Sequence, residues 1–258
     1  MDPMQPLPPF FYEIFDPSLP RLGPGDASLT RKAFEMLPES FRQSGREIRA
    51  LDIGCGTGVP TIELAKHIDG TIVAVDNHQP YLDELQRRAE AAGVSEKIEA
   101  RLGSMFQLDM EDGSFDLIWS EGALYIMGIR DALTMCHRLL KPGGCLGVSH
   151  MVWFKPDPPE PCRQFLEAEC SFLVDLDTSL AMMEECGYEV LGHFSLSESC
   201  WLDNFYDPLE SRVRWLREKY GDTDPEKTAL FESIEKEIEI YRDYGSYYGY
   251  EFFLLKSQ

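Results

Sequence analysis

Short apolar runs and longer amphipathic segments alternate along residues 48–150 of the chain. The apolar runs are rich in β-branched residues, and they predict strands at 48–53, 71–75, 98–102, 115–119 and 145–149. Between them, apolar residues recur at helical spacing and predict helices that end near residue 67 or span 80–92 and 129–140. Strands that alternate with helices in this way predict a parallel sheet covered on both faces.

The N-terminal residues 1–27 lack this rhythm. Their prolines and glycines predict irregular structure, but the apolar cluster at 10–15 is more than a disordered tail carries. We therefore expect residues 1–27 to form an ordered arm packed against one domain at 28–258. The first helix of that domain is predicted to begin after Asp26 or Ser28, both of which are good helix caps.

Beyond residue 150 the chain becomes more helical. After a proline-rich linker, the pattern predicts helices near 161–174 and 178–186 and strands at 188–194 and 248–255. Two amphipathic helices between the last two strands predict a helical cover over about 200–245. The expected fold class is α/β, with a doubly wound, mostly parallel, seven-stranded Rossmann-like sheet, an N-terminal arm and a C-terminal helical insertion.

The charge of the chain excludes several partners. With a formal net charge of −21, the protein would repel nucleic acid and anionic lipid, so neither is an expected partner. No basic residue precedes Arg21, which argues against a signal peptide, and we expect a cytoplasmic protein. The seven cysteines have no C-x-x-C spacing, so we expect neither a metal site nor a disulfide framework.

A glycine-rich loop follows the first predicted strand. Residues 52–58 read DIGCGTG and lie where that strand ends and a helix begins, so their glycines permit a sharp turn and a closely bound ligand. The dinucleotide fingerprint would place its third glycine where Val59 stands. Asp52 would repel a pyrophosphate but suits a ligand with an ammonium group and no phosphate, such as S-adenosylmethionine.

A second acid, Asp76, ends the second predicted strand, roughly 20 residues past the loop. An acid at that place accepts hydrogen bonds from both hydroxyls of a ribose. The loop, its preceding acid and Asp76 together predict a site for a ligand that contains a nucleoside.

These residues resemble the class I S-adenosylmethionine-dependent methyltransferases, and within them the ubiquinone/menaquinone-biosynthesis-like small-molecule branch. The likeness covers residues 28–150 and includes the segments 52–58, 102–105, 115–120 and 139–144 together with Asp76. It implies S-adenosyl-L-methionine as cofactor, with S-adenosyl-L-homocysteine as product. The cofactor-binding residues it implies are Asp52, Gly54, Cys55, Gly56, Gly58, Asp76, Asn77, Gly103, Ser104, Met105, Ser120 and Glu121.

The acceptor side is less defined, because methyl transfer from a sulfonium needs alignment and exclusion of water more than a fixed catalytic group. Glu121, Tyr125 and His150 are the candidates for a catalytic group, although a structural hydrogen bond explains a histidine at a strand end as well. Aromatic residues in the arm and around the cover suit an aromatic, apolar or amine acceptor. The substrate candidates are Tyr12, Arg21, Tyr125, Trp153, Tyr206 and Tyr244.

We therefore predict an enzyme that transfers a methyl group from S-adenosylmethionine to a small molecule by in-line displacement. Two alternatives are a nicotinamide-dependent oxidoreductase, disfavoured by Asp52 and Val59, and a non-catalytic protein that binds S-adenosylmethionine. The sequence leaves the acceptor and the oligomeric state open.

Overall fold

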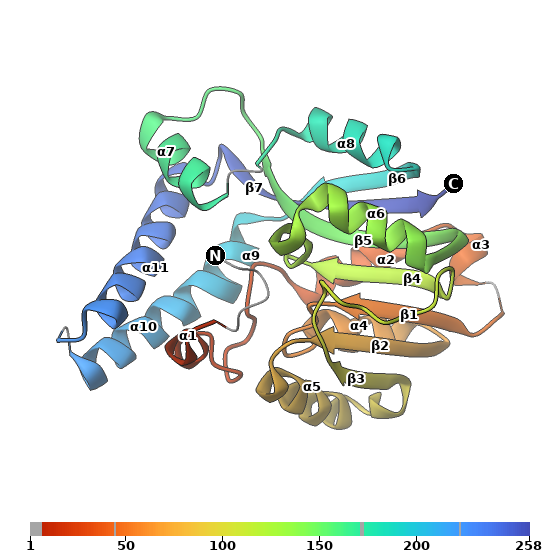
Figure 1. Cartoon of the computed structure of the whole chain (residues 1–258), viewed down its shortest axis with the longest axis horizontal. Coiled ribbons are helices and arrows are strands. Elements are labelled where there is room, and N and C mark those ends of the chain that lie inside the picture. Colours follow the sequence, from red (N-terminus) through yellow and green to blue (C-terminus); the bar gives the residue numbers. More distant parts are fainter. Residues whose placement is uncertain (1–6, 44, 171–172, 222) are drawn as a thin grey trace.

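A seven-stranded mixed sheet forms the centre of the computed structural model, which describes residues 7–43, 45–170, 173–221 and 223–258 (Figure 1). Its strands are β1 (Ile48–Ile53), β2 (Gly70–Asp76), β3 (Ile98–Leu102), β4 (Phe115–Glu121), β5 (Leu140–Trp153), β6 (Tyr188–Ser195) and β7 (Tyr248–Ser257). They are ordered β3-β2-β1-β4-β5-β7-β6, and β7 alone runs antiparallel to its neighbours. This confirms the predicted doubly wound, mostly parallel sheet.

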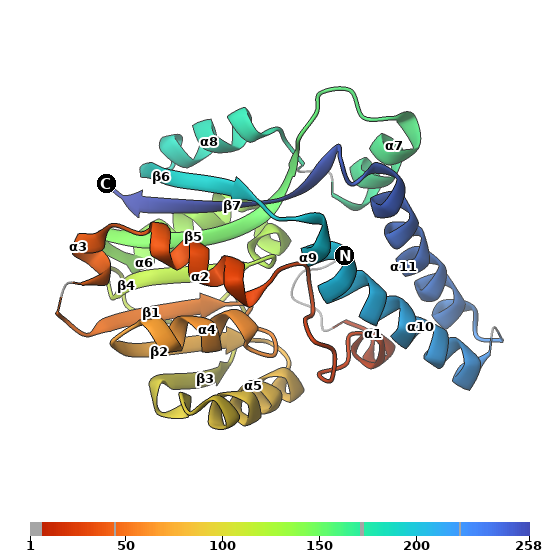
Figure 2. The same cartoon turned by 180° about the vertical axis from the view of Figure 1, so that it is seen from behind.

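Helices cover both faces of the sheet (Figures 1 and 2). On one face lie α2 (Ala27–Met36), α4 (Val59–His67) and α5 (Gln79–Ala92); on the other lie α6 (Ile129–Leu139) and α8 (Leu176–Glu185). The short elements α3 (Glu39–Arg42), η1 (Ser95–Lys97) and η2 (Leu124–Met127) complete the connections. Each face therefore has its own apolar core, and the strands between them are almost continuously buried.

A helical cover stands beyond the carboxyl ends of β1 and β4, to the left of the sheet in Figure 1. It consists of α7 (Glu160–Glu169), α9 (Glu198–Trp201), the π-helical turn η3 (Leu202–Tyr206), α10 (Asp207–Tyr220) and α11 (Pro225–Tyr244). Apolar faces on α10 and α11 pack it together, with Val213, Leu216 and Ile234 buried. No helix in the described ranges is long and apolar enough to span a membrane.

The N-terminal arm packs against this cover. Its helix α1 (Pro9–Ile14) buries Ile14 completely, and Phe10 meets Tyr220 and Phe231 edge-to-face at centroid distances of 5.6 and 5.4 Å. Arg88 of α5 holds the other side of the arm, as its guanidinium donates to three of the arm's carbonyls. Residues 1–6 of the predicted arm lie outside the described residues.

Two predicted elements end elsewhere in the structure. The strand predicted at 145–149 is part of the longer β5, because residues 145–153 pair without interruption with β7. The helix predicted near 161–174 ends at Glu169; residues 171–172 of that range lie outside the described residues. Both differences lie on the side of the sheet that the helical cover adjoins.

Candidate active site

A cavity of about 560 Å³ lies at the carboxyl ends of β1, β2 and β4, beneath the arm and the cover. Open α/β sheets bind ligands at this edge, where the strand order reverses between β1 and β4. The loops after these strands form one wall, while the arm, α7, η3, α11 and β7 contribute the other. The cavity is therefore built from segments spread over the whole chain.

The loop between β1 and α4 can form only with glycine at two positions. Gly54 has φ +70°, and a Cβ atom there would lie 2.4 Å from the Cβ of Ala123. Gly58, the N-cap of α4, has φ +81°, and its Cβ would lie 1.8 Å from Leu85 Cδ1. The left-handed backbone and the close neighbours both require glycine, so the loop's backbone can face the cavity directly.

Asp76 at the end of β2 is held beside this loop. Its carboxylate accepts hydrogen bonds from the backbone N–H of Gly56 at 2.9 Å and of His78 at 3.0 Å. Burial raises the pKa of Asp76, and these backbone donors oppose that rise. The ring of Tyr12 stacks on His78 at 3.8 Å, so the arm closes the cavity next to this carboxylate.

Asp52 lies deeper in the same wall. It is almost fully buried and accepts a 2.6 Å hydrogen bond from the hydroxyl of Thr61. Burial raises the pKa of Asp52 to about 7, against the Thr61 hydrogen bond, and the charges of Glu121 and Asp76 add to the rise. A bound cation would stabilise the ionised form of this carboxylate.

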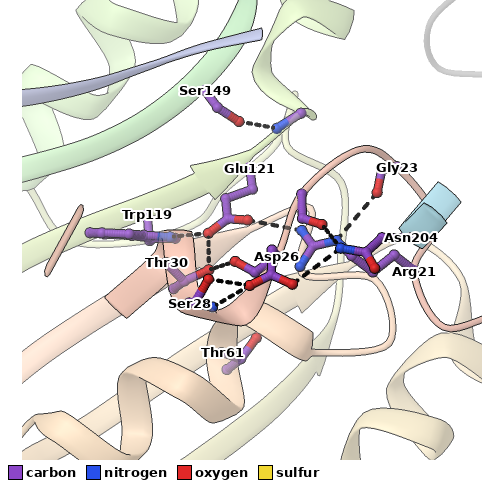
Figure 3. Close-up of polar contacts among 12 residues, drawn as sticks. Arg21, Gly23, Asp26, Ser28, Thr30, Thr61, Trp119, Glu121, Ser149 and Asn204 are labelled. Carbon is purple, nitrogen blue, oxygen red and sulfur yellow. Dashed lines mark hydrogen bonds and ion pairs between the residues drawn. The ribbon is translucent and has the colours of Figure 1, made fainter. Parts of the chain in front are cut away.

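The arm and β4 meet in a polar network (Figure 3). Arg21 Nη2 donates to Glu121 Oε2 at 2.9 Å, and both side chains are at least nine-tenths buried. The other oxygen, Oε1, accepts from Thr30 Oγ1 at 2.5 Å and from Trp119 Nε1 at 3.0 Å. Glu121 therefore has its hydrogen-bonding capacity used by protein groups, which fixes the position of Arg21.

The guanidinium of Arg21 keeps one group available. Its Nη1 is buried and has no hydrogen-bond partner among the described residues, although Arg21 lines the cavity. Asn204 of η3 donates to Gly25 O at 2.9 Å and to Asp26 Oδ2 at 3.1 Å, which ties this part of the arm to the cover. A buried, unsatisfied donor on a charged group is costly, so it marks a place for an acceptor from a ligand.

Most residues predicted to bind cofactor or substrate lie along this one cavity. From the predicted cofactor set these are Asp52, Gly54, Cys55, Gly56, Gly58, Asp76, Asn77, Gly103, Ser104, Met105 and Glu121. From the predicted substrate set they are Tyr12, Arg21, Tyr125 and Tyr206. The structure thus brings together residues that the sequence places apart, at the strand ends, in the arm and at the cover.

Four predicted residues lie elsewhere. Ser120 is buried in the sheet, where its hydroxyl donates to Ile53 O at 2.8 Å and joins β4 to β1. His150 was expected at a strand end facing the pocket, but β5 continues to Trp153, so the imidazole lies within the sheet and stacks on Phe253. Burial lowers its pKa to about 4. His150 is therefore a neutral structural residue, and it is removed from the candidates for a general base.

Trp153 and Tyr244 also lie outside the cavity lining. The backbone N–H of Trp153 donates to Val174 O at 2.9 Å, and its ring meets Tyr248 at 6.1 Å, so it supports the start of α8. Tyr244 is at the last turn of α11, where it packs on the apolar core. Trp153 was expected in the pocket because it follows the fifth predicted strand, and Tyr244 because it is an aromatic residue next to the inserted helices; neither position determines the direction of the side chain.

The acidic residues of the cover were missed by the sequence analysis. Glu169 at the end of α7 and Glu237 of α11 both line the cavity. A signal was present for Glu237, because it lies on the same helical face as Ile234, Ile238 and Tyr241. An acid on the apolar face of an amphipathic helix indicates a buried polar role.

The comparisons with known proteins agree with this arrangement. Residues 50–144 match the family model described as a methyltransferase domain. A sterol 24-C-methyltransferase of Aspergillus fumigatus is 29% identical over 170 residues, which are 63% of this chain and 45% of that protein. The chain spans about half the length of the curated relatives it matches first.

Two solved structures cover nearly the whole chain. YjhP from E. coli is 19% identical, with a TM-score of 0.82 over 97% of this chain and 100% of that one. A methyltransferase from Thiobacillus denitrificans, in complex with S-adenosyl-L-homocysteine, is 20% identical, with a TM-score of 0.78 over 98% and 100%. At these identities the likeness establishes the fold.

The fold is thus that of the class I S-adenosylmethionine-dependent methyltransferases. The methyltransferase-domain family model matches residues 50–144, which are less than half of the chain. This match agrees with the family that the loop and Asp76 predict from sequence, while the closer likeness to the ubiquinone/menaquinone branch stays a prediction. The matched segment contains the glycine loop, Asp76 and Glu121, but neither the arm nor the cover.

Proposed function

We propose that the protein is an S-adenosylmethionine-dependent methyltransferase whose acceptor is a small molecule. The observation that carries this proposal is the joint placement of the glycine loop and Asp76 on one cavity with room beyond them under the cover. A volume of about 560 Å³ falls within the range of roughly 300–1,000 Å³ in which proteins hold small ligands.

The residues present fit the cofactor. Asp76 lies where it can accept from ribose hydroxyls, and Gly54 provides a backbone surface that a side chain would block. The unpartnered Nη1 of Arg21 suits the carboxylate of the methionine portion, while the buried Asp52 suits its ammonium group. Opposite charges at the two ends of an amino acid are thus met by opposite charges on the protein.

When bound, the sulfonium supplies an activated methyl group: the acceptor's lone pair forms the new bond, and the methyl–sulfur electron pair returns to sulfur. The residues of the chain hold the two reactants in line and exclude water. The arm, η3 and α11 exclude water, since they close the cavity over the end of β4. Glu121 is a positioning residue here, because its oxygens are taken up by Arg21, Thr30 and Trp119.

The acceptor belongs to the half of the cavity beneath the cover. Phe165, Leu166 and Met151 line it together with Trp201 and several tyrosines. Such a lining favours an acceptor with apolar or aromatic surface. The similarity to a protein named as a sterol 24-C-methyltransferase is consistent with a small acceptor of this kind.

Calorimetric titration of the full chain with S-adenosylmethionine and S-adenosylhomocysteine tests the proposal, with NAD as a third ligand. We expect both sulfur ligands to bind and NAD to give no heat. Asp76→Ala should weaken their binding by about tenfold or more, because a charged hydrogen-bond acceptor is lost. Asp83→Ala, at an exposed acid of α5 that among the described residues bonds only Gln79, is the matched control and should leave the dissociation constant unchanged.

A result without heat from either sulfur ligand would contradict the proposal. Tighter binding of NAD would favour the oxidoreductase alternative instead. Binding without turnover over a broad acceptor panel would favour a protein that only binds S-adenosylmethionine.

A further inference from the structure

The acceptor half of the cavity is short of positive charge. Five carboxylates line the described cavity, at Asp52, Asp76, Glu121, Glu169 and Glu237, while Arg21 is its only basic side chain. That guanidinium is already bonded to Glu121. Of the two acids that the cover contributes, Glu169 is exposed and Glu237 is half-buried, and neither has an ion-pair partner within the described residues. A ligand for this half of the cavity therefore meets net negative charge.

A hydrogen bond from Tyr206 fixes the position of Glu237 at the cavity. Tyr206 Oη donates a 2.9 Å hydrogen bond to Glu237 Oε1, and no other described residue donates to this carboxylate. Burial raises the pKa of Glu237, and the Tyr206 hydrogen bond opposes this while the charge of Glu169 adds to it. The Glu237 side chain is half-buried, and a carboxylate in this position is stabilised when a cation binds beside it.

Aromatic rings surround the same space. Trp201 contacts Tyr250 at 4.9 Å, Tyr206 at 5.8 Å and Tyr248 at 6.4 Å between centroids, and all four residues line the cavity. The Glu237 carboxylate lies close to this group, since Tyr206, one of the four residues, donates its 2.9 Å hydrogen bond to it. Electron-rich ring faces next to a carboxylate are the combination that recognises substituted ammonium groups.

We propose that the acceptor of this protein is an amine that binds in its positively charged form, with Glu237 pairing with the ammonium and Trp201, Tyr248 and Tyr250 packing around its carbon substituents. This inference rests on the proposed function, because the amine is then the group that is methylated. It narrows the acceptor from any small apolar molecule to one with a basic nitrogen.

The chemistry of the transfer balances with these groups. The ammonium gives its proton to the Glu237 carboxylate, and the nitrogen lone pair that is freed forms the bond to the methyl carbon. The methyl–sulfur electron pair returns to sulfur, and the proton leaves Glu237 for water when the product departs. An amine with a removable proton is thus an acceptor, whereas a quaternary ammonium is only a binding probe.

A matched pair of probes isolates the positive charge. Choline and 3,3-dimethylbutan-1-ol differ by the exchange of the quaternary nitrogen for carbon. Each is titrated by ligand-observed NMR into the full chain saturated with S-adenosylhomocysteine. We expect choline to bind about tenfold more tightly than the neutral alcohol, because both the rings and Glu237 favour the charge.

Two variants locate the effect. Glu237→Gln keeps an acceptor for the Tyr206 hydroxyl but removes the charge, and it should bring the two probes to within about threefold of each other. Glu239→Gln removes a charge from the exposed face of the same helix, where the carboxylate pairs with Lys236, and should keep the full preference for choline. Both variants should bind S-adenosylhomocysteine like the unaltered protein.

Equal affinities of the unaltered protein for the two probes would overturn the amine inference while leaving the proposed function intact. A preference for choline that survives Glu237→Gln would overturn the assignment of that carboxylate. Failure of S-adenosylhomocysteine to bind at all would instead overturn the proposed function, so the two failures are distinguishable.

Discussion

Arg21 of the N-terminal arm donates a 2.9 Å hydrogen bond to Glu121 at the end of β4, and both side chains are buried. The two residues are 100 positions apart in the sequence. The pair joins the segment that closes the cavity to the strand on which the cavity is built (Figure 3). Occupation of the cavity and closure of the arm are therefore linked through one guanidinium.

Replacement of Arg21 by alanine should weaken binding of S-adenosylhomocysteine. The variant loses the buried Nη1 donor and leaves Glu121 without its cation. We expect the dissociation constant to rise roughly tenfold to hundredfold, the equivalent of about 1.5–3 kcal/mol for a hydrogen bond to a charged group. Calorimetric titration measures the change.

The control is Arg31→Ala on α2. Arg31 is also paired with an acid, Glu63, but its side chain is 48% exposed and it does not line the cavity. Its loss should leave the affinity unchanged. An equal effect of both substitutions would show that Arg21 acts through general stability and not through the ligand.

Arg88→Ala should release the arm from α5. Arg88 donates to the carbonyls of Pro17 at 2.9 Å and Leu19 at 3.0 Å, and also to Thr57 Oγ1 at 3.1 Å in the glycine loop. With these charged hydrogen bonds lost, amide exchange in the described arm residues should quicken by about tenfold to hundredfold. Hydrogen-exchange mass spectrometry gives this rate segment by segment.

Arg87 provides the comparison for that experiment. It lies next in sequence and pairs with the same Glu84, but its side chain is 68% exposed and reaches no part of the arm. Arg87→Ala should leave the arm's exchange rate as it is. Unchanged protection of the arm in Arg88→Ala would mean that α1 and its aromatic contacts hold the arm without this residue.

The fold and the cofactor half of the cavity could be predicted because their signals are local. The Asp76 position follows from a strand of β-branched residues and a count along the chain, and the 52–58 loop from its glycines. The end of β5 was misjudged because pairing with β7, about 100 residues later, extends the strand to Trp153. That extension is what buries His150.

The acceptor half could not be predicted in the same way. Glu237 of α11, Tyr250 of β7 and Tyr125 of η2 line one cavity, and no local pattern in the sequence brings these three elements together. Aromatic residues such as Tyr206 and Tyr244 look alike in sequence, yet only Tyr206 lines the cavity. Whether a residue of a helix faces the cavity depends on how that helix packs in the tertiary structure.

Gly58→Ala should destabilise the protein more than Gly93→Ala. Both glycines have left-handed backbones, with φ of +81° and +70°, so alanine brings a similar strain of about 1–2 kcal/mol at each. At Gly58 the new Cβ also overlaps Leu85 Cδ1, whereas at Gly93 nothing lies within 4 Å. Overpacking should add about 1–3 kcal/mol at Gly58.

Urea denaturation followed by circular dichroism measures both free energies of unfolding. Their difference isolates the overlap with Leu85, since the backbone strain is common to the two variants. Equal destabilisation would show that α5 moves aside without cost, and that the close approach of α4 and α5 is not required for the loop.

Affinity for S-adenosylhomocysteine should rise with pH up to about 7 and level off above it. Burial raises the pKa of Asp52 to about 7, against its hydrogen bond from Thr61, so in the free protein this carboxyl is largely protonated at lower pH. Only the ionised form pairs with the ligand's ammonium group. Below pH 7, each further decrease of one pH unit should therefore lower the affinity by up to about tenfold, which is the limit when binding is linked to one proton.

The stability of the free protein should change in the opposite sense. Because the folded state raises the pKa of Asp52 above its unfolded value near 4, the folded state holds the proton more tightly. The contribution of Asp52 to the free energy of unfolding is therefore greatest at low pH and decreases as pH rises toward 7. Asp52→Asn should remove this decrease and the pH dependence of affinity together. Calorimetry and thermal unfolding from pH 5 to 8 test both, and a slope of affinity that persists in Asp52→Asn would assign the proton to another group, such as Asp76.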